Sequence, residues 1–176
     1  MRISSLHIQN FKSIQSLKIP DIENALILVG KNNTGKTRIL NAIRAALGNY
    51  QVTDGDFNEK KQNIEISLIL EISQEDLRLF HHHRLVSPYR RYDAWLRDFC
   101  AKLPSFSGGQ LAFSCIINRF GEVRYWDGFK KHNRYIPQIL PQLYFIGTQR
   151  DVRLLQEDLF LSQDDQQLEK LRADVC

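Results

Sequence analysis

The sequence predicts an α/β fold in which an antiparallel β flap is attached to an α/β core. Three observations support this prediction. A continuous apolar run at 25–29 ends at Gly30, and a helical spacing of apolar residues begins at Thr37. Farther along, apolar and polar residues alternate over 63–73 and again over 111–117. A continuous run is typical of a strand buried on both faces, whereas alternation is typical of a strand with one solvent face.

Composition is that of an ordinary globular domain. The chain has 176 residues, of which 43% are apolar and 25% charged, and this excludes a disordered or fibrous protein. The length fits one domain. No apolar run approaches the roughly 20 residues that cross a bilayer, and the first residues alternate instead of forming a secretory signal. We therefore expect a cytoplasmic protein with no membrane partner.

Cysteine spacing and charge bear on disulfides, zinc sites and nucleic-acid contact. The three cysteines, Cys100, Cys115 and Cys176, are far apart and odd in number, which disfavours a disulfide framework or a zinc knuckle. The net charge is +4, and residues 151–176 are acidic, so the positive surplus lies in the first 150 residues. Such an excess permits contact with nucleic acid but does not require it.

The first part of the chain predicts a hairpin, a buried strand and a helix, in that order. Apolar and polar residues alternate through the first 19 residues, with a reversal at 10–13 and a stop at Pro20. The run at 25–29 predicts a strand buried in a parallel sheet. Apolar residues at helical spacing predict a helix over 37–47 that ends before Gly48.

The middle of the chain predicts a strand followed by a helical insertion at about 74–104. The alternation over 63–73 favours a half-buried, antiparallel strand. Ser73 and Asp76 resemble a capping box, which predicts a helix to about Leu85. Pro88 can start a second helix.

After the insertion, the pattern predicts a hairpin and a last buried strand. The alternating segment 111–117 leads to a turn at Phe120-Gly121 and a return strand through 123–125. A second apolar run at 143–146 predicts another buried strand, and the residues from Asp151 onward favour helix.

Residues 30–37 carry the motif that predicts chemistry. They read Gly-Lys-Asn-Asn-Thr-Gly-Lys-Thr and match the phosphate-loop (P-loop, Walker A) pattern G-x-x-x-x-G-K-[ST] at every fixed position. The glycines let successive backbone N–H groups turn inward, and the helix start adds unpaired N–H groups and a positive dipole end. Lys36 would reach the β- and γ-phosphates, and the Thr37 hydroxyl would bind Mg²⁺. The alternative is a strand-to-helix turn without a ligand.

The motif makes a nucleoside triphosphate with Mg²⁺ the expected ligand. The predicted nucleotide-binding residues are Gly30, Asn32, Asn33, Thr34, Gly35, Lys36, Thr37 and Arg38. A kinase or GTPase can use the same loop, but no guanine-reading Asn-Lys-x-Asp is present.

The residues around the loop resemble the amino-terminal lobe of ABC-type ATPases of the RecF and structural-maintenance-of-chromosomes (SMC) group. The resemblance rests on Ile8-Gln9-Asn10-Phe11-Lys12-Ser13-Ile14, on the phosphate loop and on Leu40-Asn41-Ala42-Ile43. Within this group the chain is most similar to the overcoming-lysogenization-defect (OLD) family. That family resembles it also in the acidic loop at Asp54, Asp56 and Phe57 and in a late strand ending near an arginine, here Arg150.

The resemblance implies a P-loop NTPase lobe of ABC-ATPase type that binds ATP, dimerises head to head and acts on DNA. In the OLD family a carboxy-terminal Toprim nuclease often serves anti-phage defence. The resemblance also places Gln149 as the glutamine that senses Mg²⁺ and the γ-phosphate, and Lys12 beside the nucleotide. A surface glutamine and a solvated hairpin lysine are the alternatives.

The sequence shows neither a Walker B strand nor an ABC signature helix, two parts of a complete ATPase. Hydrolysis needs a Walker B strand, an apolar run ending in Asp-Glu that holds Mg²⁺ and polarises water. Glu71 ends an alternating strand instead, which predicts a carboxylate at a sheet edge. Ser107-Gly108-Gly109-Gln110 resembles an ABC signature, but the signature needs a helix after it and strand-like alternation follows. We therefore expect a partial lobe without Walker B or signature helix.

A run of three histidines and the basic segment after it are weaker evidence for a metal site or a DNA contact. Consecutive residues at 81–83 of a helix point about 100° apart, so three histidines there do not close around one metal ion. The segment also carries basic and aromatic residues that can contact DNA, although the basic face of a helical insertion is the plainer explanation. These residues are Arg84, Tyr89, Arg90, Arg91, Tyr92 and Trp95.

The leading hypothesis is an ATP-binding module of an OLD-like, DNA-directed ATPase in a defence or DNA-repair system. Its expected partners are a second copy or a higher oligomer, DNA, and a nuclease domain or partner protein. The alternative is a nucleotide-sensing module that never hydrolyses ATP and regulates another protein.

Overall fold

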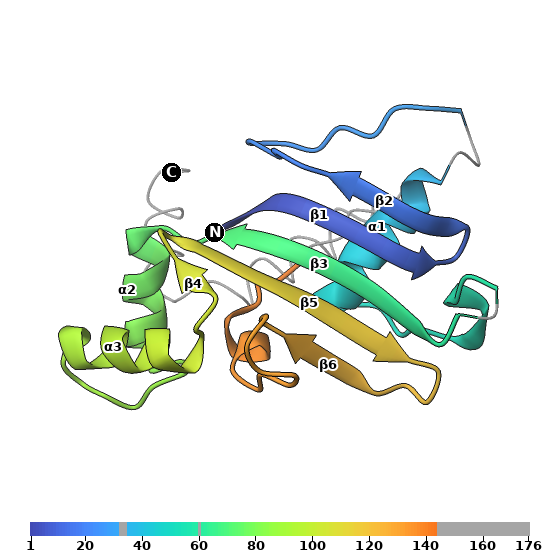
Figure 1. Ribbon diagram of the computed structural model, residues 1–176. Helices are drawn as coiled ribbons and strands as arrows, with labels where there is room; N and C mark the ends of the chain where they lie inside the picture. Colours follow the sequence, from blue (N-terminus) through green and yellow to red (C-terminus); the bar gives the residue numbers. More distant parts are fainter. Residues whose placement is uncertain (32–34, 60, 144–176) are drawn as a thin grey trace, which may run out of the picture. The chain divides into compact units, whose positions relative to one another are not determined.

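An antiparallel sheet dominates the computed structural model, which describes residues 1–31, 35–59 and 61–143 (Figure 1). Its strands run in the order β2-β1-β3-β5-β4, and β6 pairs with β5 as well. The strands are β1 (Arg2–Phe11), β2 (Ile14–Ile19), β3 (Asn63–Glu71), β4 (Phe106–Ser107), β5 (Gln110–Asn118) and β6 (Val123–Trp126). The strand predicted at 143–146, beyond its first residue, and the helix predicted from Asp151 lie outside the described residues.

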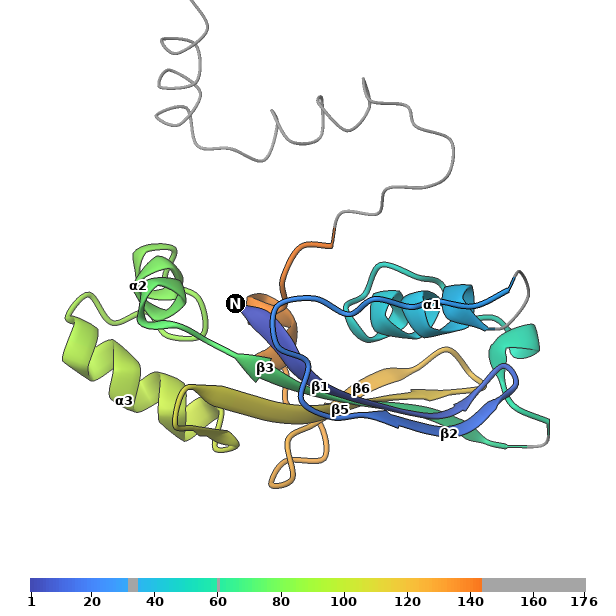
Figure 2. The ribbon, with the colours of Figure 1, turned by 90° about the horizontal axis from the view of Figure 1, so that it is seen from above.

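Three helices accompany the sheet: α1 (Lys36–Ala46), α2 (Gln74–His82) and α3 (Tyr92–Lys102). Two short 3-10 turns are η1 (Asp54–Asp56) and η2 (Ile136–Ile139). Figure 2 shows α1 along one face of the sheet, and α2 with α3 beside the end where β3 stops and β5 starts. None of the helices in the described parts of the chain is long and apolar enough to cross a membrane.

The predicted amino-terminal hairpin is confirmed. β1 and β2 pair antiparallel from Leu6 opposite Ile19 to Phe11 opposite Ile14. Alternation along β1 buries Leu6 and Ile8 completely on the face toward α1. The neighbouring residues of β1 face the other way, as the period of two requires.

The alternating segment at 63–73 also forms the predicted antiparallel strand. β3 pairs with β1 on one side and with β5 on the other, which makes it central in the sheet. Its core-facing residues are all but fully buried: Ile64, Ile66, Leu68 and Leu70. Each such side chain contributes about 1.5–3 kcal/mol relative to an exposed one, so this strand carries much of the hydrophobic stabilisation.

Helix α1 covers the sheet with the small residues of its apolar stripe. Ala42, Ala45 and Ala46 are buried, which lets the helix lie close to the strands. The Tyr125 hydroxyl on β6 donates a hydrogen bond of 3.1 Å to the carbonyl oxygen of Ala46 and ties the helix to the sheet. Leu40, another apolar residue of the helix, is 41% exposed.

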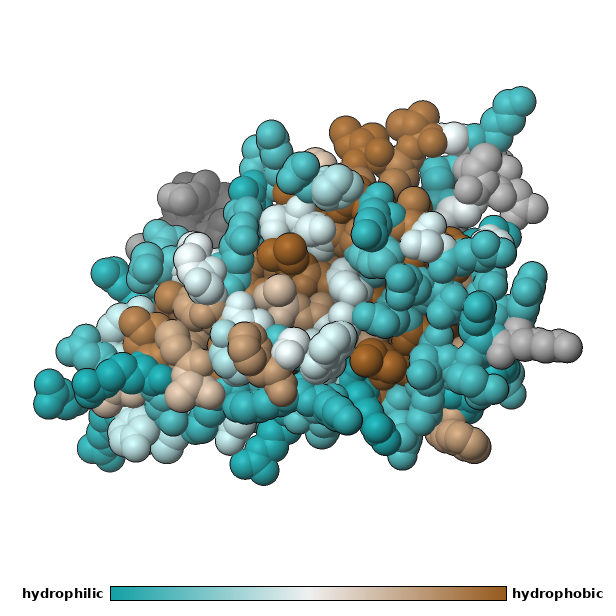
Figure 3. Space-filling model, in the orientation of Figure 1, coloured by the Kyte–Doolittle hydropathy of each residue, from teal (hydrophilic) through white to brown (hydrophobic). Residues whose placement is uncertain are grey.

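The prediction of a buried strand at 25–29 is wrong, because these residues belong to no strand. Ile27 is 81% exposed and Val29 is 89% exposed. The space-filling view shows a hydrophobic group at the top of the molecule, where Figure 1 draws segment 20–31 (Figure 3). The apolar run has the composition of a buried strand, but the described residues offer no neighbouring strand to cover it.

The helical segment between β3 and β4 is stabilised by a capping box and an aromatic cluster. Ser73 and Asp76 exchange the predicted capping contacts at the start of α2. The helix ends at His82, short of Leu85, and α3 begins at Tyr92, later than the proline at 88 suggests. In α3, Trp95 and Phe99 are fully buried, and their rings pack in a tilted arrangement with centroids 4.9 Å apart.

Candidate nucleotide-binding site

Gly35 starts α1 in a conformation that favours glycine. Its φ of +96° lies in the left-handed region, where a side chain causes strain. No side chain caps the helix, and no acid lies in its first turn. The first N–H groups of α1 and the positive end of its dipole are therefore free of competing carboxylates, as an anion site requires.

Lys36 turns back over the phosphate loop. Its Nζ atom donates hydrogen bonds of 2.6 Å to the carbonyl oxygen of Gly30 and 2.7 Å to that of Lys31. The ammonium group is thus held at the loop by two neutral acceptors. Asn32, Asn33 and Thr34 lie outside the described residues, so their predicted roles stay predictions.

The two residues that follow Lys36 have different surroundings. Thr37 is exposed in the first turn of α1, where its hydroxyl is accessible to a cation. Arg38 donates a hydrogen bond to the Ser13 hydroxyl in the turn between β1 and β2. This contact brings the hairpin of the Asn-Phe-Lys-Ser sequence against the start of α1, although the two lie far apart in the chain.

Lys12, expected beside the nucleotide, is paired with a buried carboxylate. Its Nζ lies 3.0 Å from Oδ1 of Asp56, which is 3% exposed. The hydrogen bond to Asp56 raises the pKa of Lys12. Burial alone would raise the pKa of Asp56, but hydrogen bonds from Thr53, Lys12 and Tyr50 lower it overall. Lys12 is therefore a structural partner of η1 in this conformation, and contact with a nucleotide stays a prediction.

Sequence reasoning missed the role of Tyr50 in this network. Its hydroxyl donates a 2.9 Å hydrogen bond to Asp56, and its ring lies under the Lys12 ammonium at 5.7 Å. The Arg44 guanidinium of α1 lies 5.8 Å from the same ring. The signal available in the sequence was the short spacing from Tyr50 to Asp56, which lets a single turn bring the two together.

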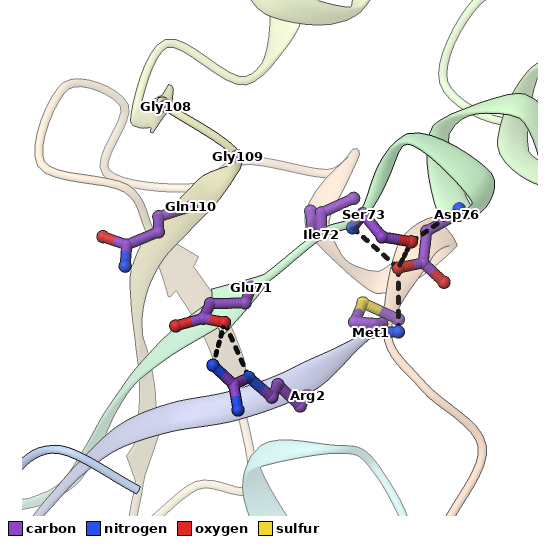
Figure 4. A pocket seen from close by; sticks show the side chains of 9 residues that line it. All are labelled: Met1, Arg2, Glu71, Ile72, Ser73, Asp76, Gly108, Gly109 and Gln110. Carbon is purple, nitrogen blue, oxygen red and sulfur yellow. Dashed lines mark hydrogen bonds and ion pairs between the residues drawn. The ribbon is translucent and has the colours of Figure 1, made fainter. Parts of the chain in front are cut away.

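A separate cavity is lined by Glu71, Asp76 and the Gly108-Gly109 pair (Figure 4). It has a volume of about 610 Å³ and lies at the start of β1, where Met1 and Arg2 are found. The start of α1 contacts the other end of the hairpin through Arg38 and Ser13, about 30 Å along β1 at about 3.3 Å per residue. In this cavity Arg2 pairs with Glu71 at 2.6 Å, and the Met1 amine pairs with Asp76 at 2.8 Å. Its polar groups are therefore mostly engaged with one another.

Glu71 and the Gly108-Gly109 pair are structural elements. Glu71 ends β3 and pairs with Arg2. The prediction of a carboxylate at a sheet edge is wrong, because β3 has a neighbouring strand on each side and Glu71 lies at the end of this inner strand. Gly108-Gly109 forms the turn between β4 and β5, and the Gly109 carbonyl accepts a 2.7 Å hydrogen bond from the Ile72 amide. A strand follows this sequence in place of the helix that an ABC signature needs.

The described stretches of the chain contain histidines and carboxylates, but these side chains are scattered. No three His, Cys, Asp or Glu side chains gather there closely enough to hold a metal ion. His81 packs against Trp95 at a ring distance of 5.5 Å, and the two histidines after it are exposed. Gln149, expected to contact Mg²⁺, lies outside the described residues.

Comparison with known proteins agrees with the fold and the loop. The family model described as AAA ATPase domain matches residues 1–118. No curated protein is a significant sequence match to this chain. Among solved structures, one from work on ATP-driven dimerization and DNA-stimulated activation of SMC ATPases is 17% identical, with a TM-score of 0.56 and full coverage of both chains.

A second solved structure is an Smc head bound to the C-winged helix domain of ScpA. It is 17% identical with a TM-score of 0.52 and covers 80% of this chain. This chain spans only 40% of that head. These likenesses show the fold, a P-loop ATPase fold similar to SMC heads with an antiparallel sheet. Because the family model matches well over half of the residues, this chain belongs to the AAA ATPase domain family.

Proposed function

We propose that this chain is the ATP-binding lobe of a DNA-directed ATPase of the RecF and SMC-like group, of the OLD type. The observation that carries the proposal is the position of Lys36, whose Nζ lies 2.6–2.7 Å from two loop carbonyl oxygens. These acceptors are neutral, whereas a triphosphate is an anion. The β- and γ-phosphates can therefore draw the ammonium group from the carbonyls into charge-assisted hydrogen bonds.

Magnesium has a suitable ligand in the same turn. The Thr37 hydroxyl is a hard oxygen donor and is accessible at the start of α1. Mg²⁺ favours oxygen ligands and commonly keeps several waters while it binds phosphate oxygens. We propose Thr37 as its protein ligand, with Gln149 as a further contact.

The exposed segment at 25–29 supports a site that other strands complete. Ile27 and Val29 lose the stabilisation of burial in the described residues, and hydrophobic strands of this kind are covered on both faces in parallel sheets. We propose that an additional lobe brings these strands and the catalytic acid, and that two such ATPases dimerise on ATP. One of the similar SMC structures comes from work on ATP-driven dimerization, which supports this proposal.

The biological setting follows from the OLD resemblance. We propose a cytoplasmic role in defence or DNA repair, with a Toprim-type nuclease domain or a partner nuclease as the effector. The sequence resemblance is the support for this setting.

A titration calorimetry experiment tests the nucleotide site. ATP with Mg²⁺ is expected to bind the wild-type chain, and Lys36→Ala is expected to lower its affinity by at least about tenfold because one charge-assisted contact is worth about 1.5–3 kcal/mol. Lys31→Ala is the matched control, since it changes a lysine of the same loop at a variable position of the motif. Equal affinities for Lys36→Ala and wild type would contradict the proposal.

A second candidate function is a nucleotide sensor that regulates a partner without hydrolysis. The missing Asp-Glu strand favours it. Phosphate-release assays on the chain, alone and with duplex DNA, separate the two functions. Steady turnover by this chain would exclude the sensor and reveal a catalytic acid elsewhere in it.

A further inference from the structure

The connection between α2 and α3 carries a group of exposed basic side chains. We call this group the basic connection, and its members are His82, His83, Arg84, Tyr89, Arg90 and Arg91. No Asp or Glu occurs between Asp76 and Asp93, so the connection has no acid of its own. The group lies at the outer end of the helical segment, away from the phosphate loop (Figure 1).

The arginines of this region differ from the other arginines that the structure describes. Arg2, Arg119 and Arg124 each pair with a carboxylate, and Arg38 and Arg134 each bond to a hydroxyl. Within residues 1–31, 35–59 and 61–143, the arginines without an ion-pair or hydrogen-bond partner for the guanidinium group all lie between 78 and 97. They are Arg78, Arg84, Arg90, Arg91 and Arg97.

Hydrogen bonds tie the backbone of the basic connection to its neighbours. His81 Nε2 lies 2.9 Å from the carbonyl oxygen of Arg90, and the Arg84 amide donates to the carbonyl of His81 at 3.0 Å. Both arginines therefore flank one histidine. On the inner side, the amide of Val86 donates to Gln138 at 3.0 Å, and its carbonyl accepts from Lys102 at 2.9 Å.

Local strain accompanies this arrangement. Val86 has a φ of +67° and Arg84 a φ of +53°, and a β-branched residue in this region is uncommon. Strain of this kind costs on the order of 1–3 kcal/mol and persists where the surrounding structure enforces it. Here it turns Val86 into the core, where it is 6% exposed, and leaves Arg84 outside.

Helix stability does not explain Arg90 and Arg91. Arg91 is the residue before α3, and no side chain caps the helix there. Cations near a helix N-terminus oppose the dipole, so this placement is unfavourable for the folded chain alone. Such a concentration of unpaired positive charge is complementary to a polyanion.

We propose that the basic connection binds the phosphate backbone of DNA. Guanidinium groups bind phosphates through two parallel hydrogen bonds, and three of them held on one short connection can follow successive phosphates. Tyr89, which is 52% exposed beside them, adds a ring that can lie against sugar or base. Contact through phosphates makes the binding sensitive to salt and indifferent to sequence. This proposal deepens the proposed function by naming the surface that contacts DNA.

The test compares two triple variants of the full chain. Arg84→Ala with Arg90→Ala and Arg91→Ala removes the basic connection. Lys18→Ala with Arg124→Ala and Arg134→Ala removes the same charge from exposed positions elsewhere. Fluorescence anisotropy with a labelled 30-base-pair duplex, and with a single strand of the same length, is measured from 50 to 200 mM NaCl without nucleotide.

We expect the first variant to bind DNA at least about tenfold more weakly than wild type. The slope of log binding constant against log salt concentration should fall in magnitude by roughly 2 to 3, because each lost phosphate contact removes about 0.9 from it. Arg84→Lys with Arg90→Lys and Arg91→Lys should recover most of the affinity. An equal loss in both alanine variants would overturn the proposal, as would no binding by wild type at 50 mM NaCl. The proposal would also be overturned if the alanine substitutions weakened binding of an acidic peptide of residues 151–174 and left DNA binding unchanged.

ATP titration of the same variants keeps this proposal distinct from the proposed nucleotide site. The alanine variant of the basic connection should bind ATP as wild type does, and Lys36→Ala should keep its DNA affinity in the absence of nucleotide. If the chain failed to bind ATP, the DNA result would still stand. If it failed to bind DNA, the ATP result would still stand.

Discussion

The central strand β3 and the segment 20–31 both carry apolar residues, but those residues differ in burial. Ile66 in β3 is 0% exposed, whereas Ile27 is 81% exposed. β3 has a hydrogen-bonded neighbour on each side and α1 over one face, and the segment at 25–29 belongs to no strand. The comparison teaches that an apolar run is buried only where other segments supply both its edges and its faces. The sheet meets this condition within the described residues, and the approach to the phosphate loop does not.

The largest expected effect separates these two regions directly. Ile66→Ala should lower the free energy of unfolding by about 2–5 kcal/mol, because it leaves a cavity in the core. Ile27→Ala should change it by less than about 0.5 kcal/mol, since the side chain is already in solvent. Urea denaturation followed by circular dichroism measures both. Similar losses for the two variants would mean that the segment at 25–29 is buried after all.

The next prediction concerns the contact between the hairpin and η1. Lys12→Met should cost about 1–3 kcal/mol because it leaves the carboxylate of Asp56 buried without its cationic partner. Lys18→Met, at an exposed position of β2, is the matched control and should be nearly neutral. Thermal unfolding of both variants provides the measurement, and an equally stable Lys12→Met would show that Lys12 is free for another role.

Acid should weaken the flap through its buried carboxylates. Hydrogen bonds from the Lys130 amide and the Asn133 side chain lower the pKa of Asp127 below its usual value, although burial opposes them. A lowered pKa in the folded state means that the unfolded state binds protons first. The stabilisation is complete above the unfolded pKa of about 3.9 and is lost as pH falls through the lower folded value.

Urea midpoints between pH 2.5 and pH 6 test this dependence. Asp127→Asn should flatten the decline at low pH by on the order of 1 kcal/mol, since one titrating group is removed. An unchanged pH profile for this variant would contradict the assignment.

The smallest effect is a difference in thiol reactivity. Burial raises the pKa of the Cys115 thiol to about 12, and Cys115 is fully buried in β5. Cys100 in α3 is partly exposed. In a Cys176→Ser background, an aromatic disulfide reagent should modify Cys100 in the native protein and Cys115 only after unfolding. Rapid modification of Cys115 would indicate that β5 opens readily.

The phosphate loop and the elements with strong local signals were predictable from the sequence. Alternation identified β1, β3 and β5, and the Ser73–Asp76 capping box identified the start of α2. These signals are local, because side-chain period and helix caps depend on residues a few positions apart. The likeness to RecF and SMC-like ATPases was also accessible, since it rests on a short motif and its flanks.

The tertiary structure alone decided which groups meet across the chain. It paired Lys12 with Asp56 and Tyr50, placed Arg38 against Ser13, and left the apolar run at 25–29 uncovered. It also left the arginines of the helical segment without carboxylate partners. These outcomes depend on contacts between distant residues and on which neighbours are present to bury a segment, and no local pattern encodes either. Local periodicity therefore determined the elements, and long-range packing determined which charges are neutralised and which remain available to a ligand.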